Sequence, residues 1–241
     1  MKKTVFALAL LSVLAIQKTK AQIQTLVDQR MVTLFMENVE RTGSNNTEYL
    51  PDDYIGSPYG NPIFLLGNIY EQNKVIASNY VLRFNAFQDE VEVKKDLYAE
   101  DSEIKILTKN PEIYVKIMDD MFVFRDAVAE SHEAGYYQIL HVGKAYSLYK
   151  KVAKKYYPAK KAQNSFEKDV LATYVDRPVY FLVSQEGVFQ EFGSSKKKRL
   201  KLFQNKQSEL KEIVKSRKLN LNEEQDLLKL VKYYDTISSV Q

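Results

Sequence analysis

The sequence predicts a mainly β protein of the α+β class: a curved antiparallel meander or half-barrel of about nine to eleven strands with a small C-terminal helical cap. Three observations lead to this prediction. The 241 residues include 17 Tyr and 12 Phe, and aromatic side chains favour strands. Apolar and polar residues alternate along much of residues 56–192, which is the period of strands with one buried face. After Gly193 the apolar residues recur at helical spacing instead.

The strand period is clearest in the stretch 56–95, around which we expect the sheet to be organised. Its apolar face is formed by Ile76, Tyr80, Leu82, Phe84 and Ala86. Arg83 and Asn85 point the other way, as a sheet with one buried and one solvated face requires. Beyond a turn, Val91 and Val93 alternate with charged residues. These are Glu90, Glu92 and Lys94. A slip of one residue would bury the charges, so the pattern also fixes the register.

An ordered loop is expected before the first strand, because Pro58 and Pro62 fix the backbone and remove two donors. Tyr49, Tyr54 and Tyr59 are interleaved with the prolines of this region. Rigid tyrosine-rich loops can stack on sugars or peptides, so the three tyrosines are candidate binding residues. The alternative is that they cover an open end of the sheet.

More strands are expected further along the chain. They fall at residues 104–107, 113–118, 121–125, 135–142, 145–152, 173–175, 179–184 and 188–192. The turns between them contain typical residues such as Asp119-Asp120 and Gly143-Lys144. The polar, Lys-rich segment 158–169 is expected to leave the sheet. So many strands in one meander must curl, split into two layers or close into a barrel.

Helices are expected at both ends of the mature chain. Residues 24–40 have apolar side chains at helical spacing and predict a short amphipathic helix. Three short helices are expected after Gly193: over 196–203, around 210–214 and from 222 onward. Ser194 or Ser195 would cap the first helix, and Asn222 with Gln225 resembles a capping box for the third. Because such short helices make a weak core by themselves, we expect residues 194–241 to pack on the β domain of residues 22–193.

The N-terminal residues 1–21 have the features of a signal peptide. Two lysines precede an apolar core at residues 5–16, and Thr19 and Ala21 put small residues at positions −3 and −1. We therefore expect cleavage before Gln22 and a mature chain in the periplasm, at the cell surface or outside the cell. The apolar core is shorter than the ~20 residues that a membrane-spanning helix needs, and no later stretch could span a bilayer.

The chain has no cysteine, which excludes a lipoprotein anchor, disulfides and thiolate chemistry. Without the four lysines of the signal peptide, the 35 basic residues become 31, which equals the number of acidic residues. The charge is unevenly distributed. Residues 22–130 hold 10 basic and 19 acidic residues, a net charge of −9, whereas residues 131–241 hold 21 and 12, a net charge of +9.

Much of the positive charge lies in residues 144–161 and 196–218. The candidate surface-binding residues are Lys196, Lys197, Lys198, Arg199 and Lys201. Basic patches of this kind can bind nucleic acid, but export argues against that partner. The partners that fit the compartment are anionic envelope lipid or polysaccharide, or another envelope protein. The alternative is an ordinary solvated helix face.

No pattern identifies catalytic, metal-binding or cofactor-binding residues. His132 and His141 are the only histidines, and His132-Glu133 lacks the second histidine of a zinc-protease motif. Ser57 does not have the spacing of a nucleophile elbow. The paired carboxylates Asp52-Asp53 and Asp119-Asp120 stand where turns are expected.

Three parts of the chain carry a resemblance to a known family. The run GSPYGNPIF–GNIY–VLRFNAFQDEVEVK, together with the later KKYYPAKKAQNSFEKD and the Lys/Leu-rich C-terminus, resembles a family of secreted envelope proteins of Bacteroidota whose function is unknown. The resemblance covers most of the mature chain. It implies a fold and a compartment but no reaction, because its motifs carry no known catalytic residues.

The function that fits these observations is a non-catalytic, envelope-associated scaffold or binding protein. Two alternatives remain open at this point. One is a carrier of a hydrophobic ligand inside a curved sheet or half-barrel, which requires apolar residues without packing partners. The other is a hydrolase that uses carboxylates or His141, which requires these groups to converge in a cleft.

Overall fold

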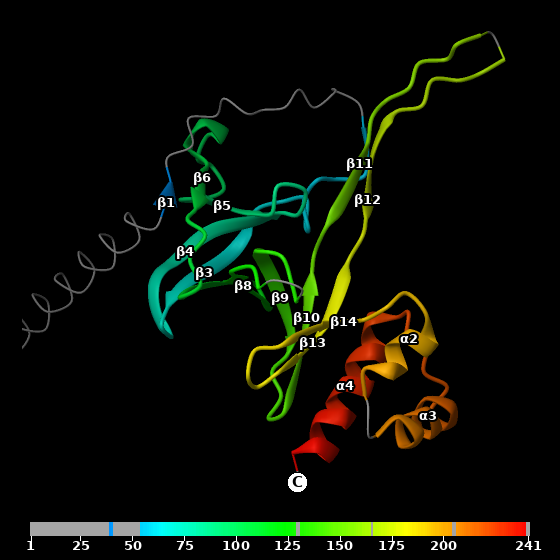
Figure 1. The fold of residues 1–241 in the computed structure, drawn as a ribbon. Helices are drawn as coiled ribbons and strands as arrows, with labels where there is room; N and C mark the ends of the chain where they lie inside the picture. Colours follow the sequence, from blue (N-terminus) through cyan, green and yellow to red (C-terminus); the bar gives the residue numbers. More distant parts are fainter. Residues whose placement is uncertain (1–38, 41–53, 129–130, 165, 204–205, 240–241) are drawn as a thin grey trace, which may run out of the picture.

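The chain forms a large antiparallel sheet, a smaller sheet that extends into a protruding arm, and a group of helices at one end of the large sheet (Figure 1). The computed structural model describes residues 39–40, 54–128, 131–164, 166–203 and 206–239. The mainly β class and the small helical cap predicted from the sequence are confirmed. Within the described residues, the large sheet has 11 strands and stays open at its two edges.

The large sheet grows in two directions from its centre. In spatial order its strands are β1 (Val39–Glu40), β6 (Lys105–Leu107), β5 (Glu90–Lys94), β4 (Lys74–Asn85), β3 (Leu65–Glu71), β7 (Ile113–Ile117), β8 (Asp120–Arg125), β9 (Gly135–His141), β10 (Tyr146–Lys151), β13 (Val179–Ser184) and β14 (Phe189–Glu191). Strands β3 to β6 extend the sheet to one side and β7 to β10 to the other. Every expected strand except the one at 173–175 is present in the large sheet. Short hairpin turns keep most consecutive strands adjacent.

The core lies against the face of β4 that the sequence predicts. Leu82 and Phe84 are fully buried, and Phe84 stands opposite Val91 in the ladder with β5. The Phe84 ring stacks on Phe122 of β8 with 4.8 Å between ring centroids, and its edge meets Tyr136 at 6.0 Å. Strand β4 is therefore the centre of the main hydrophobic cluster, and the predicted register is confirmed.

The opposite face of β4 and β5 differs from the prediction. The sequence places Glu92 and Lys94 in solvent, yet they are only 6% and 7% exposed. The loop 56–64 covers this face and makes backbone hydrogen bonds to the end of β4, from Gly60 N to Phe84 O at 2.9 Å among others. The buried charges are tolerated because each has an oppositely charged partner.

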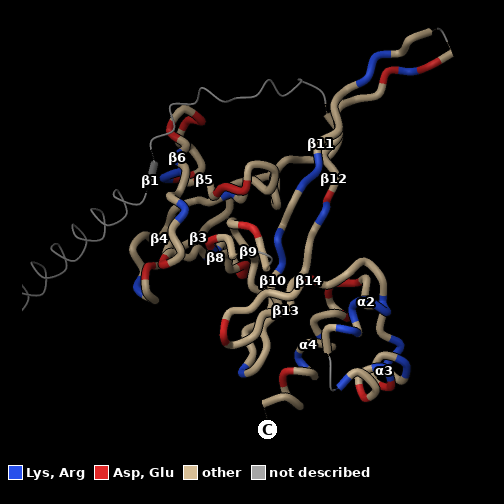
Figure 2. Tube along the Cα trace, viewed as in Figure 1, with Lys and Arg blue, Asp and Glu red and all other residues tan. Residues whose placement is uncertain are grey.

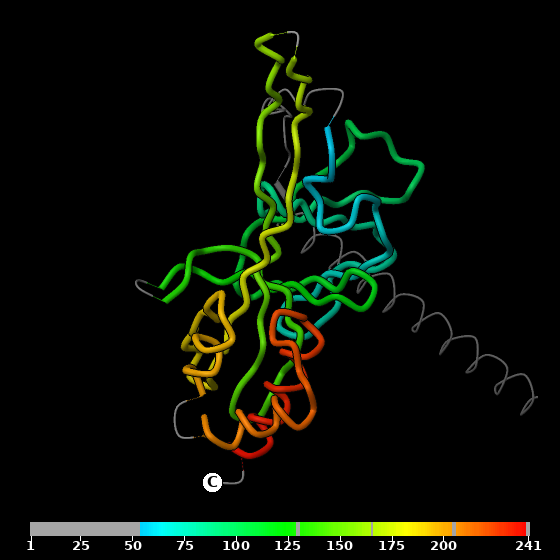
Figure 3. The backbone as a smooth tube through the Cα atoms, turned by 90° about the vertical axis from the view of Figure 1, so that its right-hand side faces the viewer, coloured from blue at the N-terminus to red at the C-terminus, as the bar shows by residue number. Residues whose placement is uncertain are grey.

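The segment after β10 leaves the large sheet as an arm, defined here as residues 154–176. Strands β11 (Lys154–Tyr157) and β12 (Ala172–Asp176) form its base and join β2 (Tyr54–Ile55) in a three-stranded sheet. A further bridge between Lys160 and Val170 extends the pairing toward the tip. Figures 1 and 3 show the arm projecting away from the rest of the chain. The predicted excursion is confirmed, but the strand expected at 173–175 belongs to this small sheet and pairs with β11, which the sequence analysis did not predict.

The helical cap consists of α2 (Lys196–Lys201), α3 (Gln207–Ser216) and α4 (Glu224–Ser238). The three helices bury a common apolar cluster against β10 and β13, with Leu148 and Leu182 on the sheet side. The Oγ of Ser195 accepts a hydrogen bond from Lys198 N, so the predicted cap of the first helix is confirmed.

The capping box predicted for the third helix is wrong. Helix α4 begins after Glu223, whose side chain makes no capping hydrogen bond. The backbone N–H of Asn222 instead donates to Oδ1 of Asn220 at 3.2 Å, and the side chain of Asp226 accepts from Asn220 N at 2.9 Å. The turn before α4 is therefore organised around Asn220, because a local Asx turn replaces the helix cap.

Two predicted segments lie wholly or mostly outside the described residues. These are the signal peptide over residues 1–21 and most of the N-terminal helix over 24–40. Val39 and Glu40, at the end of that predicted helix, form strand β1 and pair with β6. Among the described residues no helix combines the length and the apolar character that crossing a membrane needs.

Candidate functional site

Of the three candidate tyrosines, Tyr54 and Tyr59 lie in the described part of the chain and have different surroundings. Tyr49 lies outside the described residues. Tyr54 belongs to β2, is 37% exposed and meets the ring of Tyr174 edge-on at 5.5 Å. Tyr59 is half-buried under the guanidinium of Arg83, whose Cζ lies 3.6 Å from the ring centroid. Burial raises the pKa of the Tyr59 hydroxyl, as does the nearby carboxylate of Glu92.

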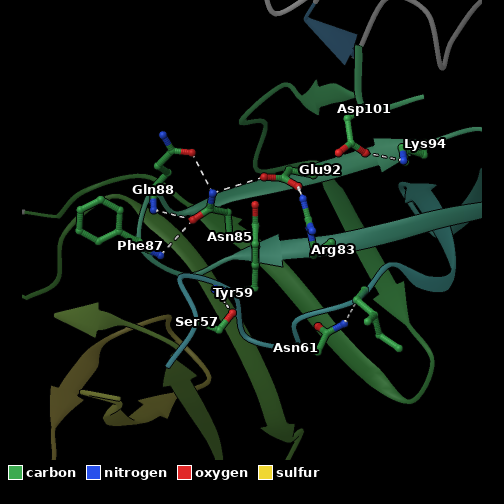
Figure 4. A network of polar contacts seen from close by, with 11 residues as sticks. Ser57, Tyr59, Asn61, Arg83, Asn85, Phe87, Gln88, Glu92, Lys94 and Asp101 are labelled. Carbon is green, nitrogen blue, oxygen red and sulfur yellow. Dashed lines mark hydrogen bonds and ion pairs between the residues drawn. The ribbon is translucent and has the colours of Figure 1, made fainter. Parts of the chain in front are cut away.

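Arg83 organises a polar network that holds the loop 56–64 on the sheet (Figure 4). Its Nε and Nη2 donate to Oε2 of Glu92 at 2.8 and 2.6 Å, and its Cζ also lies 4.2 Å from the ring of Phe64. Asn85 donates to the other oxygen of Glu92 at 3.3 Å. Tyr59 thus covers a face of β4 and β5, whereas the sequence, as the alternative to binding, predicts that the tyrosines cover an open end of the sheet.

The other polar candidates also have structural contacts. Ser57 Oγ accepts a hydrogen bond from Tyr59 N at 3.2 Å, as a turn serine does. Asp120 begins β8 beside the turn and accepts from Gln138 Nε2 at 2.7 Å. Asp52 and Asp53 lie outside the described residues. In the described part of the chain, no group of three or more His, Asp and Glu side chains is placed to hold a metal ion.

His141 joins the sheet to the helical cap. Its Nε2 lies 3.5 Å from Oδ2 of Asp235 in α4. The Asp235 carboxylate also accepts the backbone N–H groups of three consecutive residues in the β9–β10 turn, Lys144, Ala145 and Tyr146. Burial opposes ionisation of Asp235, but the backbone hydrogen bonds and His141 outweigh it and lower the pKa of the carboxyl.

His132 lies at a pocket of about 490 Å³ beside the base of the arm. We call this the root pocket. It is lined by Ala127, Val128, Ser131, His132, Glu133, Tyr137, Lys151, Val179, Phe181 and Glu191. The imidazole stacks on Phe189 with 3.9 Å between ring centroids. Burial lowers the pKa of His132, and nearby positive charges lower it further. A hydrogen bond to the backbone of Asp126 has the opposite effect but is outweighed.

The floor of the root pocket is aromatic and its rim is charged. Tyr137 is fully buried, donates from its hydroxyl to Glu133 O at 2.7 Å, and has a pKa raised by burial to about 12. Lys151 Nζ lies 3.5 Å from Oδ2 of Asp89 and donates to Ala134 O at 3.4 Å. No pattern in the sequence predicts this pocket, because its walls come from four separate segments.

The basic residues of the cap separate into two groups. Lys196, Lys197, Lys198 and Lys201 are exposed on α2 and take part in none of the ion pairs of the described residues. Arg199 is half-buried and donates to the carbonyl of Gly193 at 2.9 Å and to that of Leu221. Arg199 thus fastens α2 to the turn before α4, whereas the four lysines face solvent. Figure 2 shows further basic residues along α3.

Comparison with known proteins gives no relative: no family model, no curated protein and no solved structure matches the chain. The resemblance to secreted Bacteroidota proteins therefore stays a prediction.

Proposed function

We propose that the protein is a non-catalytic binding protein of the cell envelope, exported by its signal peptide, that adheres to anionic lipid through its helical cap. The observation that carries this proposal is the set of exposed lysines without ion pairs on α2 and α3. On α3 and the turn after it, Lys211, Lys215 and Lys218 add to the four lysines of α2.

An anionic membrane surface attracts each nearby basic residue by about 1 kcal/mol, so several lysines together support weak but real adhesion. The exposed acids Glu209 and Glu212 on α3 reduce this attraction. Glu209 accepts a hydrogen bond from the hydroxyl of Tyr233 at 2.9 Å. The net charge of α2 and α3 remains positive, which favours contact with lipid phosphates.

The cap is well placed to present these lysines as a unit. Its apolar cluster packs against Leu148 and Leu182 of the sheet, and Asp235 ties α4 to the β9–β10 turn. Such a cap can adhere without refolding, so little ordering entropy opposes binding.

Cosedimentation with vesicles tests this proposal. The full chain should pellet with phosphatidylglycerol vesicles at 0.1 M salt and stay in solution with phosphatidylcholine vesicles. Raising the salt to 1 M should release it, because the Debye length falls from about 10 Å to about 3 Å. The variant Lys196→Glu/Lys197→Glu/Lys198→Glu should lose binding.

A matched control changes the same charge elsewhere. Lys74, Lys95 and Lys109 are exposed on the β part of the chain, so replacing all three by Glu alters the net charge equally. This control should pellet more than the cap variant does. Equal pelleting of the two variants would show that net charge alone governs the contact. No pelleting with either kind of vesicle, together with binding to a soluble anionic polysaccharide, would point to polysaccharide in place of lipid.

A further inference from the structure

The arm exposes apolar side chains to an unusual degree. Among the described residues, 14 large hydrophobic side chains are exposed, and six of them belong to the small sheet and its arm. These are Tyr54, Ile55, Tyr157, Phe166, Val170 and Leu171. Phe166 near the tip is 99% exposed. A concentration of apolar residues on a projecting element marks an interaction site, because solvation of these side chains is unfavourable.

The tip is held in a defined conformation around Phe166. The backbone N–H of Phe166 donates to Asn164 Oδ1 at 3.0 Å, and Glu167 accepts from Asn164 Nδ2 at 3.1 Å and from Gln163 N at 3.2 Å. Asp169 accepts from Ala162 N at 2.7 Å. Both acids of the tip are thus bonded within it.

The lysines of the tip remain available. Lys160, Lys161 and Lys168 are exposed and take part in none of the ion pairs of the described residues. The tip therefore presents one aromatic anchor surrounded by positive charge. Aromatic residues, Phe among them, are enriched at the buried cores of protein interfaces.

The root pocket has the complementary properties. Its volume of about 490 Å³ lies within the range of about 300–1,000 Å³ that small-molecule sites occupy, so it has room for an aromatic side chain. Val128, Val179, Phe181 and Tyr137 supply apolar walls. Glu133 and Glu191 are exposed at its rim. Lys151 is paired with Asp89, so the charge that a bound side chain would meet at the rim is negative.

The position of the pocket suggests how the two features meet. It is lined by Lys151, the last residue of β10, and by Val179, the first residue of β13, and these residues flank the arm on both sides. The pocket is therefore at the root of the arm, whereas Phe166 belongs to the loop beyond the Lys160–Val170 bridge. Figure 3 shows this loop at the far end of the arm. Two arms lying antiparallel would place each tip at the root of the other.

We propose that two copies of this chain form a two-fold symmetric dimer in which Phe166 of each copy occupies the root pocket of the other. The lysines around Phe166 then lie beside Glu133 and Glu191, and Tyr157, Val170 and Leu171 line the contact between the arms. Such a contact closes on itself, because each copy offers one tip and one pocket.

Sedimentation velocity of the full chain over a wide range of concentrations tests the dimer. The wild type should change from monomer to dimer as concentration rises. Phe166→Ala should weaken the dissociation constant by about tenfold or more, since truncating a central aromatic anchor has effects of this size. Phe166 is fully exposed in the single chain, so this variant keeps its fold. The matched control is Tyr98→Ala, which removes an aromatic side chain that is 96% exposed outside the arm.

A charge exchange tests the pairing of tip and pocket. One variant has Lys160, Lys161 and Lys168 replaced by Glu; the other has Glu133 and Glu191 replaced by Lys. Each variant alone should stay monomeric, because like charges would meet at both contacts. Their equimolar mixture should dimerise, because both contacts become complementary. Adding Phe166→Ala to both variants should abolish this dimer, which excludes a general attraction between oppositely charged chains.

Three results would overturn the proposal. The first is a wild type that stays monomeric at every concentration. The arm would then be a binding site for a different protein. The second is a dimer that Phe166→Ala leaves intact. The third is a mixture of the two charge variants that does not associate.

Discussion

Asp235 of helix α4 accepts a hydrogen bond from the backbone N–H of Ala145, 2.7 Å away in the turn between β9 and β10. The neighbouring N–H groups of Lys144 and Tyr146 donate to the same carboxylate at 3.1 and 3.0 Å. Three successive backbone donors form an anion site of the kind that usually binds a free anion. Here the anion is a side chain from the far end of the sequence, so the contact fixes the helical cap to the sheet.

Asp235→Asn should destabilise the protein by about 1.5–3 kcal/mol, because charge-assisted hydrogen bonds are lost and an amide NH₂ faces backbone donors. The folded state lowers the pKa of Asp235 below its ordinary value of 3.8. The contribution of Asp235 is therefore complete above that value and disappears as the pH falls through the lower, folded pKa.

Urea denaturation of wild type and Asp235→Asn across acidic pH checks this prediction. The stability difference between the two proteins should be largest near neutral pH and should shrink below pH 3.8. Glu212→Gln, which changes an exposed carboxylate on α3, should follow the wild type at every pH. A difference that stays constant down to strongly acidic pH would mean that the charge of Asp235 contributes nothing.

The centre of the large sheet gives a second prediction. Phe84 is fully buried between Phe122 and Tyr136, so Phe84→Ala should cost about 3–5 kcal/mol. This is a large part of the ~5–15 kcal/mol that stabilises a typical domain. Thermal melting provides the measurement, with Tyr98→Ala as the exposed counterpart, because the Tyr98 side chain is 96% exposed. If both variants melt at the wild-type temperature, the core assignment of Phe84 is wrong.

The sequence predicts the large sheet well and its surroundings poorly, for physical reasons. Leu82 and Phe84 could be assigned to the core because the alternation of period two is a local signal. The burial of Glu92 could not be predicted, since it depends on a loop folding back over β5. The bond between Asp235 and the β9–β10 turn is equally non-local, and no pattern in the sequence links the two.

The candidate sites also combine local features, which the sequence predicts, with non-local contacts, which it does not. The exposure of Lys196 to Lys198 follows from the charge of their side chains, whereas the internal role of Arg199 depends on Leu221 in a later turn. The root pocket combines residues from β9, β10, β13, β14 and a connecting loop, so it exists only once the strands are in order. The arm was visible in the sequence as a polar excursion, but its pairing into strands was not.

The buried ion pair of Arg83 and Glu92 leads to a third prediction. Glu92→Leu should destabilise the protein by about 3–5 kcal/mol, because Arg83 is left without its carboxylate under the loop 56–64. Replacing Arg83 by Met in the Glu92→Leu variant should recover much of this loss, because no buried charge is then left without a partner. Equilibrium unfolding of both single variants and the double variant gives the coupling energy. Additive costs would show that the two side chains act independently.

Gly143 is tested last, because it makes room for the Asp235 carboxylate. A Cβ at this position would lie 2.5 Å from Cγ of Asp235 and would also collide with the carbonyl of Tyr146. Gly143→Ala should therefore push the turn away from α4 and cost about 1–3 kcal/mol, as overpacking does. Because Gly143→Ala and Asp235→Asn disturb the same contact, the double variant should lose less stability than the two single variants together. Hydrogen exchange gives an independent measurement: in each variant the amides of Ala145 and Tyr146 should lose protection while those of β4 keep theirs. Additive stability costs with unchanged protection at Ala145 would show that the turn holds α4 without the Asp235 carboxylate.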